Sequence, residues 1–438
     1  MTKLELHWQI LIAIVIAVVA GSLVFNAHEA TGVEPALFGK VRYIAIFDYI
    51  GTIFLNALKM IIVPLILSSI VVGVAGIGSS GNLGTLGGKT LLFYASTTTA
   101  AILLGLVLIN ATAPGYVDGE PAKELLALDT PIEEIAAKVE GKGAGDVAEV
   151  FLRMVPPNIA QAAVEGQMLG IIFFAMLFGY FMTRLENQYS EPLYKFWDGI
   201  FHVMMRMTEW IMKFAPIGVF GLVAATVAET SFQAARPLLV FSGTVLLALA
   251  LHAFVTLPLL LRFVGRARPY KTLKGCAQPM LTAFSTASSS ATLPVTMEAV
   301  EENIGVSNKV SSFVLPLGAT VNMNGTALYE CAAAMFLAQA YGLELTFGIQ
   351  FSIVVIALLT SIGVAGVPSA SLVAIAIILG AIGLPLEALG ILLVFDRILD
   401  MARTSINVWG DCTCATIIAR LSGEQTNVAD DAELSRAA

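Results

Sequence analysis

Charged residues are scarce in this chain: Asp, Glu, Lys and Arg make up 13% of its 438 residues, against ~25% in soluble domains. Hydrophobic residues make up 57%, and the mean hydropathy is +0.83. This composition excludes a disordered chain. With 24 Lys and Arg against 32 Asp and Glu, it also excludes a basic nucleic-acid-binding surface. The sequence predicts a multi-span membrane protein and not a soluble enzyme.

Cysteines and catalytic motifs are also sparse. The four cysteines fit no zinc or haem spacing, so we interpret them as buried thiols in a reducing compartment. P-loop, nucleophile-elbow and dinucleotide-binding glycine motifs do not occur in a suitable context. The sequence therefore predicts neither an enzyme nor an organic cofactor. No convincing cleavage site ends the first apolar run, residues 8–27, which is expected to stay as a span.

Long apolar runs, in contrast, recur along the whole chain. A membrane-spanning helix needs about 20 apolar residues, and several runs reach or approach that length. They predict an all-α membrane protein with eight transmembrane helices. The predicted spans are residues 6–26, 41–78, 86–112, 147–186, 191–228, 234–264, 306–341 and 385–421.

Two further apolar runs, residues 275–297 and 345–386, are interrupted by polar or helix-breaking residues. The second contains no charge, and as a straight helix it would be about twice as long as the ~30 Å hydrocarbon core is thick. Its middle, 361–371, holds two glycines and a proline, and the first run is broken by serines at 285–294. Non-helical backbone at membrane depth is tolerated only inside protein, so we predict two re-entrant helical hairpins.

The two interrupted runs occupy corresponding places in the sequence. Each is followed by a helix with an asparagine-containing polar patch, at residues 322–326 and 407–411. Paired interruptions of this kind indicate a transporter built from inverted repeats. The alternative is a generic helix bundle with two accidental interruptions.

Basic residues set the predicted orientation, because they accumulate in cytoplasmic loops. The segment 118–149 is rich in acids and is expected outside, as an amphipathic surface excursion. Counting spans then places both termini in the cytoplasm. The cytoplasmic loop is identified by five basic residues without an intervening acid: Arg262, Arg266, Arg268, Lys271 and Lys274.

The last predicted span carries the strongest functional signal. Charges inside a membrane are costly unless they are paired or hydrated, so a charged stripe on one helix must face a polar cavity. This stripe has more acids than bases and leaves capacity for an added cation. A structural ion-pair network, with pairs such as Asp396–Arg397, is the alternative. The stripe recurs at intervals of three or four residues and consists of Asp396, Asp400, Arg403, Asn407 and Asp411.

The residue types in the stripe suit a zwitterion with a second carboxylate. Arg403 can bind a carboxylate through two parallel hydrogen bonds, and Asp400, one turn away, can bind an ammonium group. The main-chain carboxylate is expected at backbone N–H groups of the serine-rich break. Asp411, with Asn407 and Asn322, offers hard oxygen ligands for a small cation.

The chain resembles the glutamate/aspartate transporter family, which includes bacterial dicarboxylate and amino acid:cation symporters and animal excitatory amino acid transporters. The resemblance covers nearly the whole length. The motifs that carry it are KMIIVP at 59–64, SSSATLP at 288–294, PLGATVNMNGTALYE at 316–330, GVP at 366–368 and LDMARTSINVWGD at 399–411.

The resemblance implies a homotrimer in a bacterial-type inner membrane, the plasma membrane, that works by an elevator mechanism. A mobile transport domain would move against a fixed scaffold, with the second hairpin as its gate. The implied scaffold is residues 1–85 and 147–228, the transport domain 86–112 and 229–421, the extracellular excursion 113–146 and the cytoplasmic tail 422–438.

By position, the resemblance also implies one substrate site and three sodium sites, with sodium ions as coupling ions. The substrate site consists of Ser288, Ser289, Ser290, Thr326, Val367, Asp400, Arg403 and Asn407. The first sodium site consists of Gly318, Asn322, Asn407 and Asp411. The second, under the gating hairpin, consists of Thr320, Ser361, Ile362 and Val364, and the third of Tyr94, Thr97, Thr98, Asn322 and Asn324.

The third sodium site departs from the family pattern. Asn324 stands where the family usually has aspartate, so a negative charge is lost. On a regular helix Asn324 would point away from Asn322 and Thr326, so the site needs unwound backbone at residues 323–325.

Two further positions bear on proton coupling and charge. Glu330 resembles the proton carrier of the animal transporters, and a buried carboxyl can load and release a proton; a permanently protonated structural residue is the alternative. Ala287 stands where some relatives carry an arginine. We expect Arg397 to fill that space from the last span, the alternative being a pair with Asp396 or lipid headgroups only.

The sequence therefore predicts a secondary active symporter that moves glutamate or aspartate into the cell with sodium and also with protons. The alternative is a proton-driven or mixed-cation symporter for acidic amino acids or C4-dicarboxylates that lacks the third sodium site. Asp400 disfavours a plain C4-dicarboxylate carrier, and Arg403 disfavours a neutral amino acid carrier. The expected partners are the substrate, the cations, the lipid bilayer and further copies of the chain, with no nucleic acid.

Two other classes are weaker candidates. A membrane aspartyl hydrolase would need Asp400 and Asp411 as a pair, but three helical turns separate them by about 16 Å. A ligand-gated anion channel stays open as a secondary activity, because transport and anion leak coexist in the family that the chain resembles.

Overall fold

The computed structural model describes residues 6–31, 35–37, 41–79, 85–126, 128, 155–164, 168–230, 235–343, 345–361 and 371–429. This part of the chain is predominantly helical, as predicted. Two short antiparallel strand pairs accompany the helices: β1 (Ala36–Leu37) with β2 (Val41–Arg42), and β3 (Tyr116–Val117) with β4 (Glu120–Pro121).

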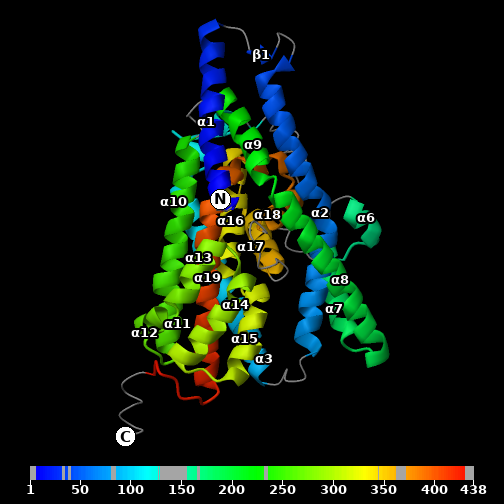
Figure 1. Ribbon diagram of the computed structural model, residues 1–438, viewed down its shortest axis with the longest axis vertical. Helices are drawn as coiled ribbons and strands as arrows, with labels where there is room; N and C mark the ends of the chain where they lie inside the picture. Colours follow the sequence, from blue (N-terminus) through cyan, green and yellow to red (C-terminus); the bar gives the residue numbers. More distant parts are fainter. Residues whose placement is uncertain are drawn as a thin grey trace, which may run out of the picture.

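The described residues of each predicted span form either one helix or several helical segments in succession. The bundle they form is elongated, and α1, α2, α10 and α19 run roughly along its long axis (Figure 1). Four spans are single helices: α1 (Leu6–Thr31), α2 (Tyr43–Ser79), α3 (Thr85–Thr112) and α19 (Leu389–Leu421). The other four comprise several helical segments. They are α6 (Ile159–Val164) and α7 (Met168–Met182), between which residues 165–167 lie outside the described part; α8 (Asn187–Met212) and α9 (Ala215–Thr230); α15 (Asn308–Val321) and α16 (Asn324–Ala340); and α10 (Ala235–Leu251), the π-helical η3 (His252–Thr256) and α11 (Leu257–Phe263), which follow one another without a gap.

Length and apolar composition alone qualify three of the described helices as membrane spans: Trp8–Thr31, Gly87–Thr112 and Ala235–Phe263. The pair α8–α9, bent by 56°, adds a fourth if it counts as one span. The outer face of α1 exposes large apolar side chains such as Trp8, Val15 and Leu23. Apolar helices and an apolar outer surface are typical of a multi-pass membrane protein, and the count of eight spans stays a prediction.

The two interrupted runs fold as pairs of helices that pack against each other. The first pair is α13 (Ala277–Thr286) and α14 (Ser289–Glu298), preceded by α12 (Pro269–Gly275) and continued by η4 (Ala299–Ile304). The second pair is α17 (Phe347–Ser361) and α18 (Ser371–Ile382), and its connection, 362–370, lies outside the described residues. Paired helices are what re-entrant hairpins require; their depth in a bilayer stays a prediction.

The serine-rich break is a helix end followed at once by a helix start. Ala287 adopts a left-handed conformation, φ 50° and ψ 37°, which ends α13. Ser288 is extended, and its hydroxyl accepts a hydrogen bond of 3.2 Å from the backbone N–H of Ala291. This N-cap starts α14, so the chain reverses here with the first N–H groups of α14 at its tip.

The core of the bundle lies around α16 and α19. Every residue of α16, from Asn324 to Ala340, is buried, and α16 packs against α3, α10, α17, α18 and α19. Alanines and a cysteine at 331–334 allow these close approaches. Gly105 on α3 serves the same purpose, because a Cβ there would lie 3.0 Å from the Leu328 side chain. Polar residues on α16 and α19 therefore face protein and not lipid.

Helix packing separates into two groups. The first group consists of α1, α2, α7, α8 and α9, where α1 and α2 pack on α9, and α2 also packs on α7 and α8. The second consists of α3, α10 and α13–α19, which surround α16 and α19. The groups meet where α19 contacts α9 and α1, where α18 contacts α7 and α2, and where α15 contacts α2 and α17 contacts α7.

The tail predicted as a cytoplasmic extension is, up to residue 429, packed against the helix bundle. The backbone N–H of Arg268 donates to the Val428 carbonyl at 2.8 Å, and Lys271 Nζ donates to the Asn427 carbonyl at 2.6 Å. Ala267 and Ala429 form an isolated β-bridge. The basic turn before the first helix pair is therefore held by the end of the described chain.

A glycine substitution tests the tight contact between α2 and α9. A Cβ at Gly221 would lie 2.6 Å from the Phe47 carbonyl oxygen and 2.8 Å from the Gly51 nitrogen, both backbone atoms. We expect Gly221→Ala to destabilise the protein by about 1–3 kcal/mol, the usual cost of overpacking. Thermal unfolding of the detergent-purified protein measures this.

The matched control is Gly243→Ala on α10, where a Cβ would meet no atom within 4 Å. Replacing a helical glycine in open space by alanine is neutral or stabilising by up to about 1 kcal/mol. Equal unfolding temperatures for the two variants would contradict the close approach of α2 and α9.

Candidate functional site

The polar stripe of α19 lies inside the protein. Asp396, Asp400, Arg403, Asn407 and Asp411 are all buried, and Arg403 has no solvent-exposed surface. The stripe therefore faces the interior of the protein; the polar cavity expected beside it stays a prediction. The burial of α16 and α19 against each other places the stripe beside the polar residues of α16.

Arg403 is the centre of an ion cluster. Its Nη1 and Nη2 donate to Asp396 Oδ1 at 3.1 and 3.2 Å, and Nη2 also donates to Asp400 Oδ1 at 2.8 Å. The guanidinium carbon lies 3.9 Å from the centre of the Tyr329 ring on α16. A planar cation with two carboxylates at its edge and a ring on its face is held rigidly.

Arg397 completes the charge balance of this cluster. It is 7% exposed, and its Nη1 lies 3.8 Å from Asp400 Oδ2. Asp400 therefore lies between two arginines, and burial keeps Arg397 from lipid headgroups. The structure thus places Arg397 beside Asp400. Its role as a substitute arginine of the substrate site stays a prediction. The alternative interpretation of the stripe, a structural ion-pair network, applies to part of it, because Asp396 and Asp400 pair with Arg403 and Arg397.

Asn407 connects α19 to the start of α16. Its Oδ1 accepts hydrogen bonds from the backbone N–H groups of Gly325 at 2.8 Å and Thr326 at 3.3 Å. Its Nδ2 donates to the Thr326 hydroxyl at 2.9 Å. Two residues predicted in the substrate site, Asn407 and Thr326, are therefore in direct contact.

The three serines of the predicted substrate site differ in exposure. Ser288 and Ser289 are buried, whereas Ser290 is exposed. Ser289 Oγ donates to the Ala319 carbonyl at 3.0 Å, which attaches the tip of the first helix pair to α15. Because α13 and α14 also pack on α19 (Figure 1), the N-terminus of α14 is near the stripe. Such N–H groups are a carboxylate-binding arrangement.

Three residues of the predicted first sodium site come together around Asp411. Asn322 Nδ2 donates to Asp411 Oδ1 at 2.8 Å. A Cβ at Gly318 would contact that same oxygen and would lie 2.6 Å from the Tyr94 hydroxyl oxygen. Asp411 and Tyr94 can approach the backbone of α15 this closely because residue 318 is glycine and has no side chain. In the described part of the chain, Asn322 Oδ1 is buried without a hydrogen-bond partner and Asp411 forms no ion pair.

This donor set fits a sodium ion. The ion prefers oxygen ligands, and a buried carboxylate without a basic partner needs a cation. Asp411 would supply the charge, and the free oxygen of Asn322 a neutral ligand.

The helix break before the predicted third sodium site lies one residue earlier than expected. The unwound residues are Asn322 (ψ 73°) and Met323 (ψ 53°), and α16 already begins at Asn324, so Gly325 is helical. The break turns both amides to the same place: a Cβ at Gly410 would lie 3.0 Å from Asn322 Nδ2 and 2.6 Å from Asn324 Nδ2. The break therefore brings Asn324 beside Asn322, which a regular helix would not do; the third sodium site itself stays a prediction.

Other members of the third site are buried nearby. Tyr94 donates its hydroxyl hydrogen to the Val314 carbonyl at 2.8 Å, and Thr97 Oγ1 donates to the Phe93 carbonyl at 2.9 Å. Thr98 is also buried, as is Asn324, whose Oδ1 accepts from the Gly325 N–H at 2.9 Å.

The predicted second sodium site is described only in part. Thr320 is exposed, with Oγ1 donating to the Leu317 carbonyl at 3.1 Å, and Ser361 is buried, with Oγ donating to the Leu358 carbonyl at 2.8 Å. Ile362, Val364 and the predicted substrate residue Val367 lie outside the described residues.

Glu330, the predicted proton carrier, is fully buried on α16. Its Oε2 accepts a hydrogen bond of 3.0 Å from the Thr360 hydroxyl on α17. Sequence reasoning missed Thr360 and the ring of Tyr329. Both stand beside residues it had singled out, Ser361 and Glu330, but neither has a pattern that marks it.

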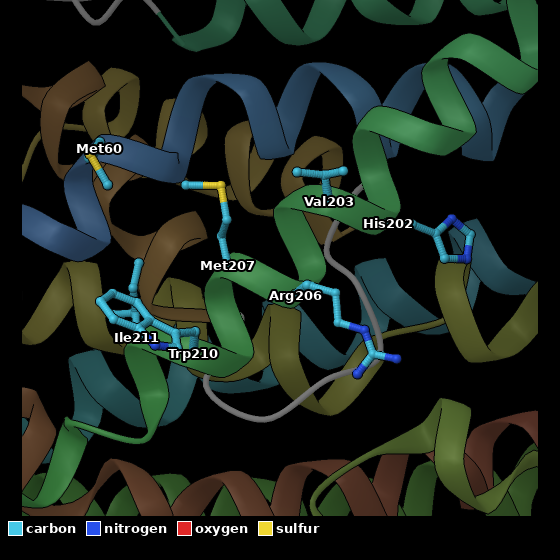
Figure 2. Close-up of a pocket in the computed structure, with 7 residues that line it drawn as sticks. All are labelled: Met60, His202, Val203, Arg206, Met207, Trp210 and Ile211. Atoms are coloured by element: carbon cyan, nitrogen blue, oxygen red, sulfur yellow. The ribbon is translucent and has the colours of Figure 1, made fainter.

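An open apolar pocket of about 410 Å³ lies elsewhere, between α2 and α8. Figure 2 shows His202 and Arg206 on one side of it, apart from Met60, Trp210 and Ile211. No residue of the predicted substrate or sodium sites lines this pocket. It is therefore separate from the candidate site.

The amino-acid sequence that builds this buried polar site matches a known family. The model of the sodium:dicarboxylate symporter family matches residues 6–421. The chain belongs to this family. The family is one of transporters, which fits a polar site built without the motifs of an enzyme.

Curated relatives cover almost the whole chain. The proton/sodium-glutamate symport protein of Geobacillus stearothermophilus is 36% identical over 97% of this chain and 96% of its own length. The proton/glutamate-aspartate symporter of Escherichia coli is 35% identical, over 95% and 93%. Excitatory amino acid transporter 3 of Mus musculus is 32% identical, over 97% and 87%.

The ion cluster makes a prediction about stability. We expect Arg403→Met to destabilise the protein by about 3–5 kcal/mol, because two buried carboxylates lose their main cation. A second substitution, Asp396→Asn, should restore part of the loss by removing one uncompensated charge. Thermal unfolding of the purified variants measures both effects.

Arg236→Met is the control. Arg236 pairs with Asp118 at 3.1 Å, but its side chain is 64% exposed, and exposed pairs contribute at most about 1 kcal/mol. A double variant no more stable than Arg403→Met alone would show that Asp396 is not coupled to Arg403.

Proposed function

We propose that the chain is a secondary active symporter that moves acidic amino acids, glutamate or aspartate, into the cell with sodium and with protons. The observation that carries this proposal is the position of Asp400, between the guanidinium groups of Arg403 and Arg397. The names of the relatives, which include sodium, protons, glutamate and aspartate, support the same substrate and ions.

Substrate binding would exchange partners within the ion cluster. The side-chain carboxylate of the substrate binds Arg403, and Asp400 turns from Arg403 to the substrate ammonium group. Asp396, bonded to both terminal nitrogens of Arg403, holds the guanidinium in place during the exchange. The main-chain carboxylate binds at the N-terminus of α14 beside Ser288 and Ser289. Each charge keeps an opposite partner throughout, which a low-dielectric site requires.

Sodium would bind beside this site through Asp411 and Asn322. The link to substrate is Asn407, which is predicted in both sites and bonds the start of α16. Sodium at Asp411 would fix the break at 322–323 and, with it, the backbone that Asn407 holds. This shared segment gives the coupling between ion and substrate a physical basis.

The two packing groups support the proposed division into scaffold and transport domain. The first group, α1, α2, α7, α8 and α9, corresponds to residues 1–85 and 147–228. The second, α3, α10 and α13–α19, corresponds to 86–112 and 229–421. All described residues of the candidate site lie on the second group. A movement of that group against the first would carry the site as a unit, as an elevator mechanism requires.

The outer face of α8 supports the proposed homotrimer. Ionisable residues of both signs follow this face at intervals of three or four residues up to the C-cap residue Lys213, and they are exposed or half-exposed. Acyl chains cannot cover such a face, so we assign it to contacts between copies of the chain in the plasma membrane, with both termini in the cytoplasm. The face consists of Glu191, Lys195, Asp198, His202, Arg206, Glu209 and Lys213.

Uptake into proteoliposomes tests the substrate and the ions. We expect concentrative uptake of labelled aspartate or glutamate under a sodium gradient, with further stimulation by an inward proton gradient. Uptake driven by protons alone, or equal uptake of a C4-dicarboxylate, would favour the mixed-cation alternative. Dissipation of a preformed aspartate gradient without ion coupling would indicate a channel.

Asp400→Asn tests the ammonium partner. We expect the aspartate concentration for half-maximal uptake to rise about 10- to 100-fold, since a hydrogen bond to a charged group is lost. Inhibition by succinate, which has no ammonium group, should not weaken. Asp118→Asn, at a position 77% exposed between β3 and β4, is the control. Equal weakening of aspartate and succinate would contradict the role of Asp400.

A charge reversal tests the contact between copies. We expect Arg206→Glu combined with Lys213→Glu to shift the purified protein from trimer to monomer, because like charges then accumulate along α8. Light scattering after size-exclusion chromatography measures the mass. Lys309→Glu, an exposed position on α15, should keep the trimer. A reversed variant that stays trimeric would place the contact elsewhere.

A further inference from the structure

A buried hydrogen bond joins the candidate proton carrier to the second helix pair. Thr360, 3% exposed and one residue before the end of α17, donates from Oγ1 to Glu330 Oε2 on α16 at 3.0 Å. The other carboxyl oxygen of Glu330 is buried without a hydrogen-bond partner in the described part of the chain. Thr360 is therefore the hydrogen-bond partner through which the described structure holds this carboxyl.

Few ionisable side chains lie on the helices next to Glu330. Arg403 on α19 is the cation whose charge acts on it, at longer range than a hydrogen bond. The described residues of α17 and α18 contain no ionisable side chain. Beside Glu330 on α16 stand Tyr329, which stacks on Arg403, and the buried thiol of Cys331.

Ionisable groups on the other helices that pack on α16 are engaged elsewhere. On α3, Lys89 donates to the Leu421 carbonyl and Tyr94 to the Val314 carbonyl. On α10, Arg236 pairs with Asp118. On α19, Asp396 and Asp400 bind Arg403, and Asp411 binds Asn322.

The Thr360 hydroxyl has one hydrogen and three acceptors within reach, one on Glu330 and two on the backbone of α17. An ionised carboxylate only accepts hydrogen bonds, so ionised Glu330 requires that hydrogen. A protonated Glu330 donates its own hydrogen to Thr360 Oγ1, which frees the hydroxyl for the Ile356 carbonyl at 2.8 Å or the Ala357 carbonyl at 3.2 Å. The direction of this one bond therefore differs between the two proton states.

We propose that Thr360 is a positioning residue that transmits the proton state of Glu330 to the second helix pair by switching its hydroxyl hydrogen between α16 and the backbone of α17. A threonine that donates to the carbonyl four residues earlier bends its helix. The bend would fall in the last turn of α17, directly before Ser361, the residue expected in the second sodium site. The inference rests on the proposed function of Glu330 as proton carrier.

The pH dependence of uptake tests the switch. Thr360→Val keeps the shape of the side chain and removes the hydroxyl. Ionised Glu330 then loses its donor, so we expect the midpoint of the pH profile of aspartate uptake, at fixed saturating sodium, to move up by about one pH unit. Thr360→Ser keeps the hydroxyl and should return the midpoint to within about 0.3 unit of the unmodified protein.

Glu330→Gln separates the two ways in which the idea can fail. If it leaves the pH profile unchanged, Glu330 is not the proton carrier and the proposed proton coupling fails. If it flattens the profile but Thr360→Val leaves the midpoint in place, the role of Thr360 alone fails. In the Glu330→Gln background we expect Thr360→Val to have no further effect on the profile. A shift there would show that Thr360 acts through another group, which also overturns the inference.

Discussion

The structure depends on the burial of one guanidinium group. Arg403 has no exposed surface, and a buried charge without partners would be strongly unfavourable. Two carboxylates from its own helix and the ring of Tyr329 compensate it. Because the ring comes from α16, the compensation requires α16 and α19 to pack closely, and small residues at 331–334 and Gly410 make that packing available.

The helix breaks also leave buried polar groups that need partners from a neighbouring helix. A break inside the bundle leaves backbone groups without helical partners, and α19 side chains supply some of them. Asn407 binds the N–H groups of Gly325 and Thr326, while Asn322, in the break itself, binds Asp411. Two of the atoms that stay unsatisfied in the described chain, Asn322 Oδ1 and Glu330 Oε1, lie where an ion and the proton are proposed to bind.

Hydropathy and helical periodicity predict the helices, their breaks and the buried stripe of α19, because these depend on local composition. Which side chains pair with each other does not depend on local composition, and it could not be predicted from the sequence. The period of 3.6 places Arg397 and Arg403 on neighbouring edges of one stripe, but only packing decides that Asp396 binds Arg403 and that Arg397 lies beside Asp400. The break at 322–323 lies a residue early because Asn322 must reach Asp411. Thr360 meets Glu330 through the packing of α17 on α16, which no local pattern encodes.

The separation of the two packing groups has a physical consequence for movement. Close backbone approaches hold the first group together: a Cβ at Gly21 would lie 2.7 Å from the Ala224 carbonyl, and one at Gly179 would lie 2.9 Å from the Val71 carbonyl. The ion cluster, Asn407 and Asp411 all lie within the second group, together with the residues to which they are hydrogen-bonded. Under the proposed elevator movement, none of these buried hydrogen bonds would have to break. The costly desolvation of the charges would occur once, on folding, and not in each transport cycle.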